Sequence, residues 1–410
     1  MENSQAKFKD LPTREKCVIC VLLLSTMAQT MGTCAVAPAM PAMSAAFPQV
    51  SATIMQMVIT LPGLALALLG VAVGAVADKL GKAPTFIVGS AVFTITGVAV
   101  ALFNNMAPIL VCRFLLGAGI ACSMVANNAI VADRYHGPLR IRVLSLQSAA
   151  VGIGIFVLEQ SGGILAGISW RAAFLIYLVG LLVFLGGIFF LLPAAKEPLP
   201  ALPGNEEPVT HVADAPHIVN AKRVITITVV GACICGFFLQ GFNFSVPSKL
   251  PYLVSALGGG SALGGFFLGC NGLATTAFSL LQAKLIVRFK RSSILFVGFL
   301  MLGGGLAGIG LGNSLVLSYL MALVAGFGQG LIFPTLLQWL SAVSTPQTSG
   351  KIMGVYNAVG YGAIFIVTLC IELVQAAAGS IAGVFIVFGC IVIVFSLLVF
   401  ACKHLIELAR

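Results

Sequence analysis

Charged residues are absent from long stretches of the sequence, and these stretches predict membrane-spanning helices. No Asp, Glu, Lys or Arg occurs in residues 17–77, 83–112 or 292–350. A helix needs about 20 apolar residues to cross the roughly 30 Å hydrocarbon core of a bilayer. The first and the last of these stretches must therefore each hold two spans, and the chain is predicted to cross a membrane many times.

The pattern predicts twelve spans, six on each side of a polar segment rich in charges and prolines. The predicted spans are residues 17–38, 51–77, 84–103, 107–132, 143–165, 172–192, 223–246, 260–283, 292–311, 315–340, 352–375 and 380–402. The expected domains are a terminal segment (1–16), a six-helix bundle (17–192), a linker (193–222), a second six-helix bundle (223–402) and a tail (403–410). The fold class is an all-α integral membrane protein.

Composition and charge support this prediction and indicate an orientation. Hydrophobic residues make up 59% of the chain and charged residues 8%, against about 25% charged in soluble domains. With the N-terminus inside, 19 of the 22 lysines and arginines lie in inner segments, Arg171 and Lys249 lie outside, and Arg113 lies within a span. This positive-inside bias predicts cytoplasmic termini in a bacterial inner membrane. The net charge of +10 therefore indicates topology rather than a nucleic-acid partner.

The two predicted bundles carry traces of an internal repeat. A shift of 209 positions places Pro38 on Pro247, and Gly63-Leu64-Ala65 on the Gly-Leu-Ala of residues 272–274. The same shift places Gly117-x-Gly119 on the Gly-x-Gly of residues 326–328. One register thus serves three spans, which favours two six-helix halves related by a pseudo-two-fold axis.

The loop after the second span resembles the signature loop of the major facilitator superfamily, Gly-x-x-x-Asp-Arg/Lys-x-Gly-Arg/Lys-Arg/Lys. The matching residues are Gly74, Asp78, Lys79, Gly81 and Lys82, with Ala83 at the last basic position. A degraded copy follows the eighth span at residues 283–292. The resemblance covers residues 17 to 402 and implies a monomeric transporter of a small molecule in the lipid bilayer, with two pseudo-symmetric six-helix bundles and no cofactor.

The resemblance also implies that this loop is a conformational latch. Asp78 would accept bonds from the helix N-terminus of the eleventh span, which begins near Lys351. Lys82 would pair with Asp133 at the inner end of the fourth span and lock the inner face when the cavity opens outward. The alternative is a basic loop that sets topology and has no switching role. Asp78→Asn should keep the fold but reduce transport if the latch hypothesis holds.

Three charged residues fall within the predicted spans, and each is a candidate functional group because burying a charge in a membrane is costly. Arg113 and Glu159 lie at similar depth, roughly 9 Å from the outer ends of neighbouring spans, so we expect them to pair. Glu159 then either couples proton binding to substrate binding or forms a static ion pair. Glu372 lies near the outer end of the eleventh span, where we expect it to be exposed at the rim.

Further motifs resemble those of the same family. The fourth span carries Ile109-x-x-x-Arg113-x-x-Leu116-Gly117-x-Gly119, and Trp170-Arg171-x-x-Phe174 begins the sixth. Drug-exporting members have Gly-x-x-x-Gly-Pro-x-x-Gly-Gly in the fifth span. Here residues 154–163 end in the two glycines but have Leu158-Glu159 in place of the central Gly-Pro. This departure leaves the antiporter motif incomplete in this chain.

Family architecture would line a central cavity with polar residues of several spans. The candidates for substrate contact or proton coupling, besides Arg113 and Glu159, are Gln29, Gln240, Asn243, Asn271, Gln338, Tyr356, Asn357 and Tyr361, with Asn127 and Asn128 also polar. Each of these is alternatively an interhelical hydrogen-bonding group. Neighbouring phenylalanines would make the cavity amphipathic, and a single cation allows an organic anion or zwitterion as substrate.

Other functional classes lack their chemistry in this sequence. Gly81-Lys82-Ala83 lacks the leading glycine and the hydroxyl of a phosphate-binding loop, and all four histidines, His136, His211, His217 and His404, lie outside the spans. We therefore predict neither an enzyme nor a metal site. The predicted function is alternating-access, proton-coupled export of a drug-like compound or metabolite. The alternatives are a proton-coupled importer of an organic anion and a membrane sensor that does not transport.

Overall fold

The fold is helical throughout the part of the chain that the structure describes. The structure is a computed structural model that describes residues 11–30, 32, 35–135, 137–194, 221–344 and 349–407. No strand occurs in these residues, and eleven helical segments are long and apolar enough to cross a membrane. The predicted all-α membrane fold is confirmed. Residues 195–220 of the predicted linker lie outside the described ranges, so the domain boundaries stay predictions.

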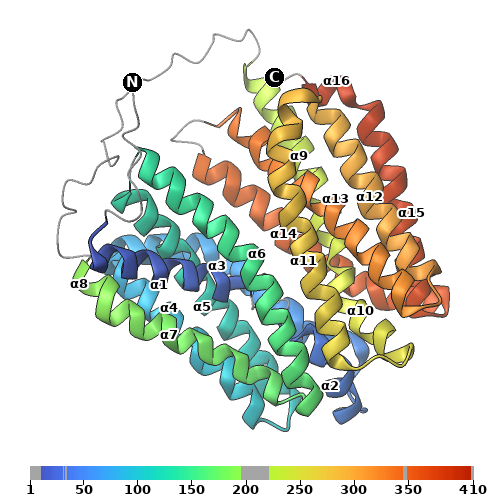
Figure 1. Ribbon diagram of the computed structural model, residues 1–410, viewed down its shortest axis with the longest axis horizontal. Helices are drawn as coiled ribbons and strands as arrows, with labels where there is room; N and C mark the ends of the chain where they lie inside the picture. The colour runs from blue at the N-terminus through green and yellow to red at the C-terminus, as the bar shows by residue number, and fades with distance from the viewer. Residues whose placement is uncertain are drawn as a thin grey trace.

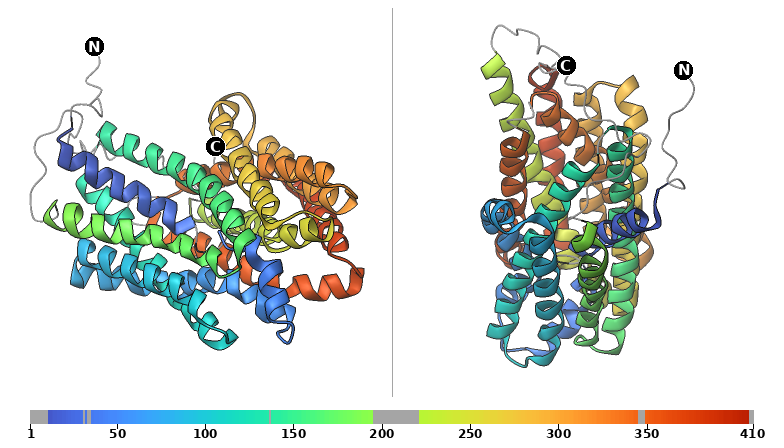
Figure 2. Two further views of the ribbon diagram at one scale, coloured as in Figure 1. Left: turned by 60° about the horizontal axis from the view of Figure 1, so that its bottom comes forward. Right: turned by 90° about the vertical axis from the view of Figure 1, so that its left-hand side faces the viewer.

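The helices fall into two groups on either side of that linker. In the first half these are α1 (Thr13–Thr30), η2 (Ala37–Ala39), α2 (Met40–Ala46), α3 (Ala52–Leu80), α4 (Lys82–Ala99), η3 (Val100–Leu102), α5 (Met106–Arg134), α6 (Gly137–Ile168), η4 (Ala172–Leu178), α7 (Val179–Gly186), η5 (Gly187–Leu191) and α8 (Leu192–Ala194). In the second half they are α9 (Ala221–Asn243), α10 (Ser245–Ala256), α11 (Ser261–Arg288), α12 (Arg291–Leu311), α13 (Leu315–Ser341), α14 (Ser349–Ala378), α15 (Ile381–Ala401) and α16 (Lys403–Ile406). Figure 1 shows the first group in blue to green and the second in yellow to red, and Figure 2 shows the same division from two further sides.

The first predicted span, residues 17–38, is not one continuous helix. Helix α1 ends at Thr30, and the short helices η2 and α2 follow. Pro38 and Pro41 each lie in the first turn of one of these short helices, where a missing N–H is tolerated. Because α1 begins with three charged residues at positions 14–16, it is absent from the eleven apolar segments, yet it packs against α5, α6 and α7.

The seventh predicted span, residues 223–246, extends further than the sequence indicated. Helices α9 and α10 together form an apolar segment over Val224–Ala256. Lys249 therefore lies within α10 and not in an outer loop, and the residue is 4% exposed. The prediction that this lysine lies in an outer loop was wrong, because the apolar segment continues past residue 246 to Ala256.

Two ends of the molecule can be distinguished. The linker end includes the start of α9 and residues 80–82, 134–135, 137, 289–290 and 341–344. The far end includes the loops near residues 48–51, 103–105, 169–171, 257–260 and 379–380. At the far end, side-chain oxygens of Ser51, Asn105, Ser314 and Ser380 accept bonds from backbone N–H groups that begin α3, α5, α13 and α15. At the linker end, Gly81 has φ +92°, which lets α3 turn directly into α4.

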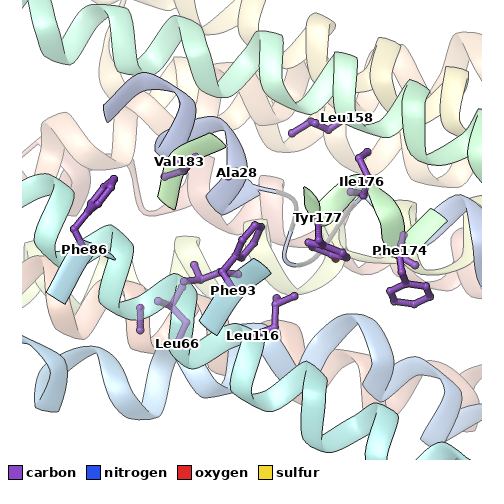
Figure 3. Packing of buried hydrophobic residues seen from close by; sticks show 14 of the residues in the cluster. Ala28, Leu66, Phe86, Phe93, Leu116, Leu158, Phe174, Ile176, Tyr177 and Val183 are labelled. Carbon is purple, nitrogen blue, oxygen red and sulfur yellow. The ribbon is translucent and has the colours of Figure 1, made fainter. Parts of the chain in front are cut away.

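Each half has its own apolar core. The core of the first half includes Phe93, Leu116, Phe174 and Tyr177, which Figure 3 shows packed between helices of that half. The second half is filled by residues of α9 to α15. Phe244 of the second half is buried in the first core, so the two halves are in direct contact.

Candidate functional site

Polar side chains at the far end join the two halves directly. The hydroxyl groups of Ser44 on α2 and Tyr252 on α10 lie 2.7 Å apart, and Tyr252 also donates to the carbonyl of Met40 at 3.4 Å. Ser248 Oγ donates to Gln56 Oε1 at 2.8 Å. These groups, at the end where α2 and α10 meet in Figure 1, hold the far end closed.

Closely packed glycines continue this contact toward the middle of the molecule along α6 and α11. A Cβ atom on Gly265 of α11 would lie 2.5 Å from the carbonyl oxygen of Glu159, and one on Gly163 of α6 would lie 2.9 Å from the carbonyl of Ser261. A Cβ on Gly269 would lie 3.0 Å from Gln160 Nε2. We call this contact of α6 with α11 the glycine seam; it lets two backbones approach more closely than larger residues allow.

Glu159 lies in the glycine seam without a polar partner for one of its oxygens. Its side chain is 4% exposed, and Oε2 has no hydrogen-bond partner. The neighbouring Gln160 Nε2, which also faces α11, is buried without a partner as well. Within the described ranges the ion pairs involve other residues, so Glu159 is a buried acid with no basic partner.

The predicted pair between Glu159 and Arg113 does not form. The fully buried Arg113 donates instead to the carbonyl of Val58, to the hydroxyl of Tyr177 at 2.7 Å and to the carbonyl of Gly32 at 2.6 Å. The predicted direction of the two side chains was wrong. Helix α5 turns its packed face toward α3 and α4, whereas α6 packs against α1 and α11.

Arg113 therefore holds several helices of the first half together. Its three bonds join α5 to α3, to η4 and to the turn that follows α1, where the first span is interrupted. The guanidinium also lies 5.7 Å from the centroid of the Tyr177 ring, within cation–π range. Figure 3 shows this tyrosine between Phe93 and Phe174 in the first core. Since buried polar groups need partners, Arg113 and the three acceptors satisfy one another.

The proposed latch residues lie at the linker end. Lys82 and Asp133 form an ion pair, with side chains 32% and 61% exposed. This pair exists while the far end is closed, so its formation does not depend on the far end opening. Gly74 is not packed against the second half, since a Cβ atom there would meet nothing within 4 Å. Lys79 is exposed. The side chains of Asp78 and Lys351 lie outside the described part, and their contact stays a prediction.

A second polar cluster at the linker end was missed from the sequence. Arg134 makes a two-point ion pair with the buried Glu15 of α1 and donates to the carbonyl of Ala194 at 2.8 Å. Tyr135 donates to Glu15 at 3.3 Å. Burial and the adjacent carboxylate raise the pKa of Tyr135. This pairing was missed because Glu15 and Arg134 are far apart in the sequence. A count of charges on each side of the membrane does not show which charges pair.

The predicted cavity residues divide into bonded and unbonded groups. Asn271 donates to the carbonyl of Ala322 at 2.7 Å and thereby ties α11 to α13. Gln338 exchanges bonds with Gln282 at 3.3 and 3.4 Å, a buried partner that the prediction omitted. Gln29 donates to Ser25 at 3.1 Å. Asn271 and Gln338 therefore act as interhelical hydrogen-bonding groups in this conformation, whereas Gln29 bonds within α1.

Other predicted cavity residues retain unused polar atoms. The hydroxyl of Tyr356 and Oδ1 of Asn243 are buried without partners. Gln240 lies against Gly360 of α14, Asn357 is exposed, and Tyr361 packs against the core of the first half. The structure therefore does not bring all predicted cavity residues into one cluster.

Two further groups of polar contacts were not predicted from the sequence. Lys249 and Glu372 form an ion pair at 2.7 Å, with side chains 5% and 18% exposed, so the expectation of an exposed Glu372 was wrong. Asn127 donates to Thr26 at 3.1 Å, and Gln147 donates to Asn127 at 3.0 Å. The latter network links α1, α5 and α6, and its signal in the sequence was three polar residues on predicted spans of one half.

The structure thus consists of two helical bundles of membrane-spanning length that meet through polar contacts. The chain belongs to the major facilitator superfamily of transporters, whose sequence profile matches residues 20–368. Members of this family are carriers and not enzymes, in agreement with the prediction.

Two related sequences match part of the chain. The chain is 36% identical over 104 residues to the "Uncharacterized MFS-type transporter EfpA" of Mycobacterium tuberculosis, covering 25% of this chain and 20% of that protein. It is 35% identical over 137 residues to the "Multidrug resistance protein MdtL" of Escherichia coli, covering 33% of this chain and 34% of that protein. The chain thus matches between a fifth and about a third of the length of these relatives.

Solved structures match nearly the whole fold. A POT family transporter in complex with 5-aminolevulinic acid superposes with a TM-score of 0.78 at 14% identity, covering 98% of both chains. The xylose transporter XylE from Escherichia coli in its inward open conformation gives 0.73 at 15% identity, covering 93% of this chain and 94% of that one. At these identities the likeness concerns the fold alone.

Proposed function

We propose that the protein exports a small amphipathic organic compound in exchange for protons, by alternating access between its two halves. The similarity to a protein named for multidrug resistance supports the outward direction. The excess of lysine and arginine at the linker end supports a cytoplasmic position for that end. In this orientation, a closed far end and an unpacked Gly74 correspond to an inward-facing state.

The buried Glu159 carries the proposal. An unpaired carboxylate in the closed glycine seam costs several kcal/mol if it is ionised. The seam therefore closes over Glu159 when the residue holds a proton. Once substrate binds from the linker end, loss of the proton to water on that side makes the closed seam unfavourable, and the far end opens. Reprotonation of Glu159 at the far end resets the carrier.

The polar groups favour an uncharged amphipathic substrate. Arg113 is fully buried and donates to three acceptors of its own half, so we do not assign it to an anionic substrate. Tyr356 and Asn243 offer a hydroxyl and an amide oxygen without partners. A ligand with a few hydrogen-bonding groups on an apolar body fits these groups better than a strongly charged one.

Transport by purified protein in liposomes tests this function. Compounds that raise the melting temperature in a screen of drugs and metabolites are added to liposomes that carry a pH gradient and an internal pH dye. We expect such compounds to move against the direction of proton flow, and Glu159→Gln to bind them but lose proton-driven movement. The control Glu372→Gln removes an acid that is already paired and should keep the coupling.

Three other results would reject the proposal. Substrate and protons that move in the same direction would indicate an importer. Ligand binding without flux would indicate a sensor. Normal proton-driven transport by Glu159→Gln would place the proton site elsewhere.

A further inference from the structure

An apolar groove lies on the outer surface of the second half, at the linker end and away from the contact between the halves. It has a volume of about 380 Å³ and lies between α9, α13, α15 and α16. Its lining includes Val230, Ile234, Trp339, Phe395, Leu398 and Ile406. This volume falls within the range of about 300–1,000 Å³ that is usual for ligand sites.

The walls of the groove face the hydrocarbon of the bilayer. Val230, Ile234 and Leu398 are 50%, 48% and 56% exposed, and all three belong to membrane-spanning segments. A membrane helix exposes such side chains to lipid and not to water. A hydrocarbon chain is therefore a more suitable occupant of the groove than an aqueous solute.

Basic side chains gather where the groove reaches the linker end. The guanidinium carbon of Arg291 lies 5.9 Å from the centroid of the Trp339 ring, and Nη1 donates to the carbonyl of Ile406 at 3.4 Å. Lys403 begins the neighbouring α16, and Lys290 precedes Arg291. The single acid in this group, Glu407, accepts a bond from the backbone of Ser292 at 2.9 Å. Among the described residues, Arg291 and Lys403 against the one acid Glu407 leave the mouth of the groove positive.

We propose that this groove holds an acyl chain of an anionic phospholipid, with the phosphate beside Arg291 and Lys403. Basic pockets between membrane helices attract anionic head groups, and the apolar walls accept the chain that follows. The two features occur together here, because Trp339 lines the groove and its ring lies close to the Arg291 guanidinium.

Tryptophan fluorescence can report lipid contact at this site directly. The chain has two tryptophans, so Trp170→Phe leaves Trp339 as the sole fluorophore. The protein is reconstituted in vesicles with brominated phosphatidylglycerol or brominated phosphatidylcholine, whose bromines quench tryptophan on contact. We expect the preference for the anionic lipid at Trp339 to be about fivefold for each of the two basic residues, Arg291 and Lys403, the factor that one basic residue near an anionic surface contributes.

Matched charge variants separate a site from general surface attraction. In the Trp170→Phe background, Arg291→Gln and Lys403→Gln should each reduce the preference several-fold. Lys290→Gln removes the same charge one residue away, at an exposed side chain, and should change the preference less than twofold. Circular dichroism and size-exclusion chromatography verify that each variant folds.

Three outcomes would overturn the proposal. Equal quenching by both lipids would remove the anionic preference. Absence of quenching by either lipid would show that another part of the protein covers the groove. Equal effects of Arg291→Gln and Lys290→Gln would reduce the preference to a diffuse surface charge.

Discussion

Replacement of Glu159 by glutamine should uncouple the shape of the carrier from pH. In the account above, the closed far end tolerates Glu159 only when the residue carries a proton, since its Oε2 has no partner in the glycine seam. Glutamine has a similar shape but no proton to lose. The variant should therefore keep the far end closed under conditions in which the wild type opens.

The size of the effect follows from the burial of the side chain. Glu159 is 4% exposed, and an unpaired ion in such a place costs several kcal/mol. A value of about 3 kcal/mol corresponds to a roughly 150-fold change in the ratio of closed to open molecules. Because the proton stabilises the closed state, this ratio should fall as the pH rises in the wild type. In Glu159→Gln it should change little.

Distance measurements between two spin labels can determine this ratio. Leu102 and Asn313 are exposed at the far end of the first and second half, and labels attached there through non-canonical residues leave the native cysteines in place. We expect a longer distance at high pH in the wild type and a constant short one in Glu159→Gln. Glu372→Gln is the matched control and should still respond to pH. A pH response in Glu159→Gln equal to that of the wild type would refute the reasoning.

Three further substitutions test other parts of the structure. Arg113→Lys cannot supply all three bonds and should destabilise the first half by about 1–3 kcal/mol per orphaned group, seen as a lower melting temperature; an unchanged melting temperature would contradict the structural role. Gly265→Ala introduces a Cβ atom 2.5 Å from a backbone carbonyl, so it should shift the spin-label distance toward the open far end, and a closed distance would count against the seam. Lys249→Met leaves the partly buried Glu372 without its partner and should cost about 3 kcal/mol, the low end of the range for a buried pair, whereas the double variant Lys249→Met/Glu372→Leu should recover much of that loss in thermal unfolding.

Much of the fold could be predicted because membrane crossing depends on local composition. The uncharged stretches located most spans to within a few residues, as with residues 315–340 against α13 (Leu315–Ser341). Breaks within a predicted membrane span were harder to predict. Pro38 and Pro247 each lie in the first turn of a short helix that follows a break, whereas Pro251 lies inside α10 without ending the apolar segment. The same residue type thus had different effects, which depend on its position in the helix.

The candidate site could be predicted as a set of residues but not as a set of contacts. Depth along a helix follows from counting residues, and on that basis Arg113 and Glu159 were predicted to lie at similar levels. The direction of a side chain depends on which helices are neighbours, and that separated the two residues. Partners such as Lys249 for Glu372 lie 123 positions apart, so no local pattern could connect them.

The most direct test of the proposed exchange is the number of protons released when substrate binds. Purified protein in weakly buffered solution is mixed with a transported compound, and a pH dye records the protons that appear. We predict that the wild type releases protons on binding and that Glu159→Gln binds the same compound without releasing them. Substrate binding to the wild type without proton release, or equal release by Glu159→Gln, would contradict the account.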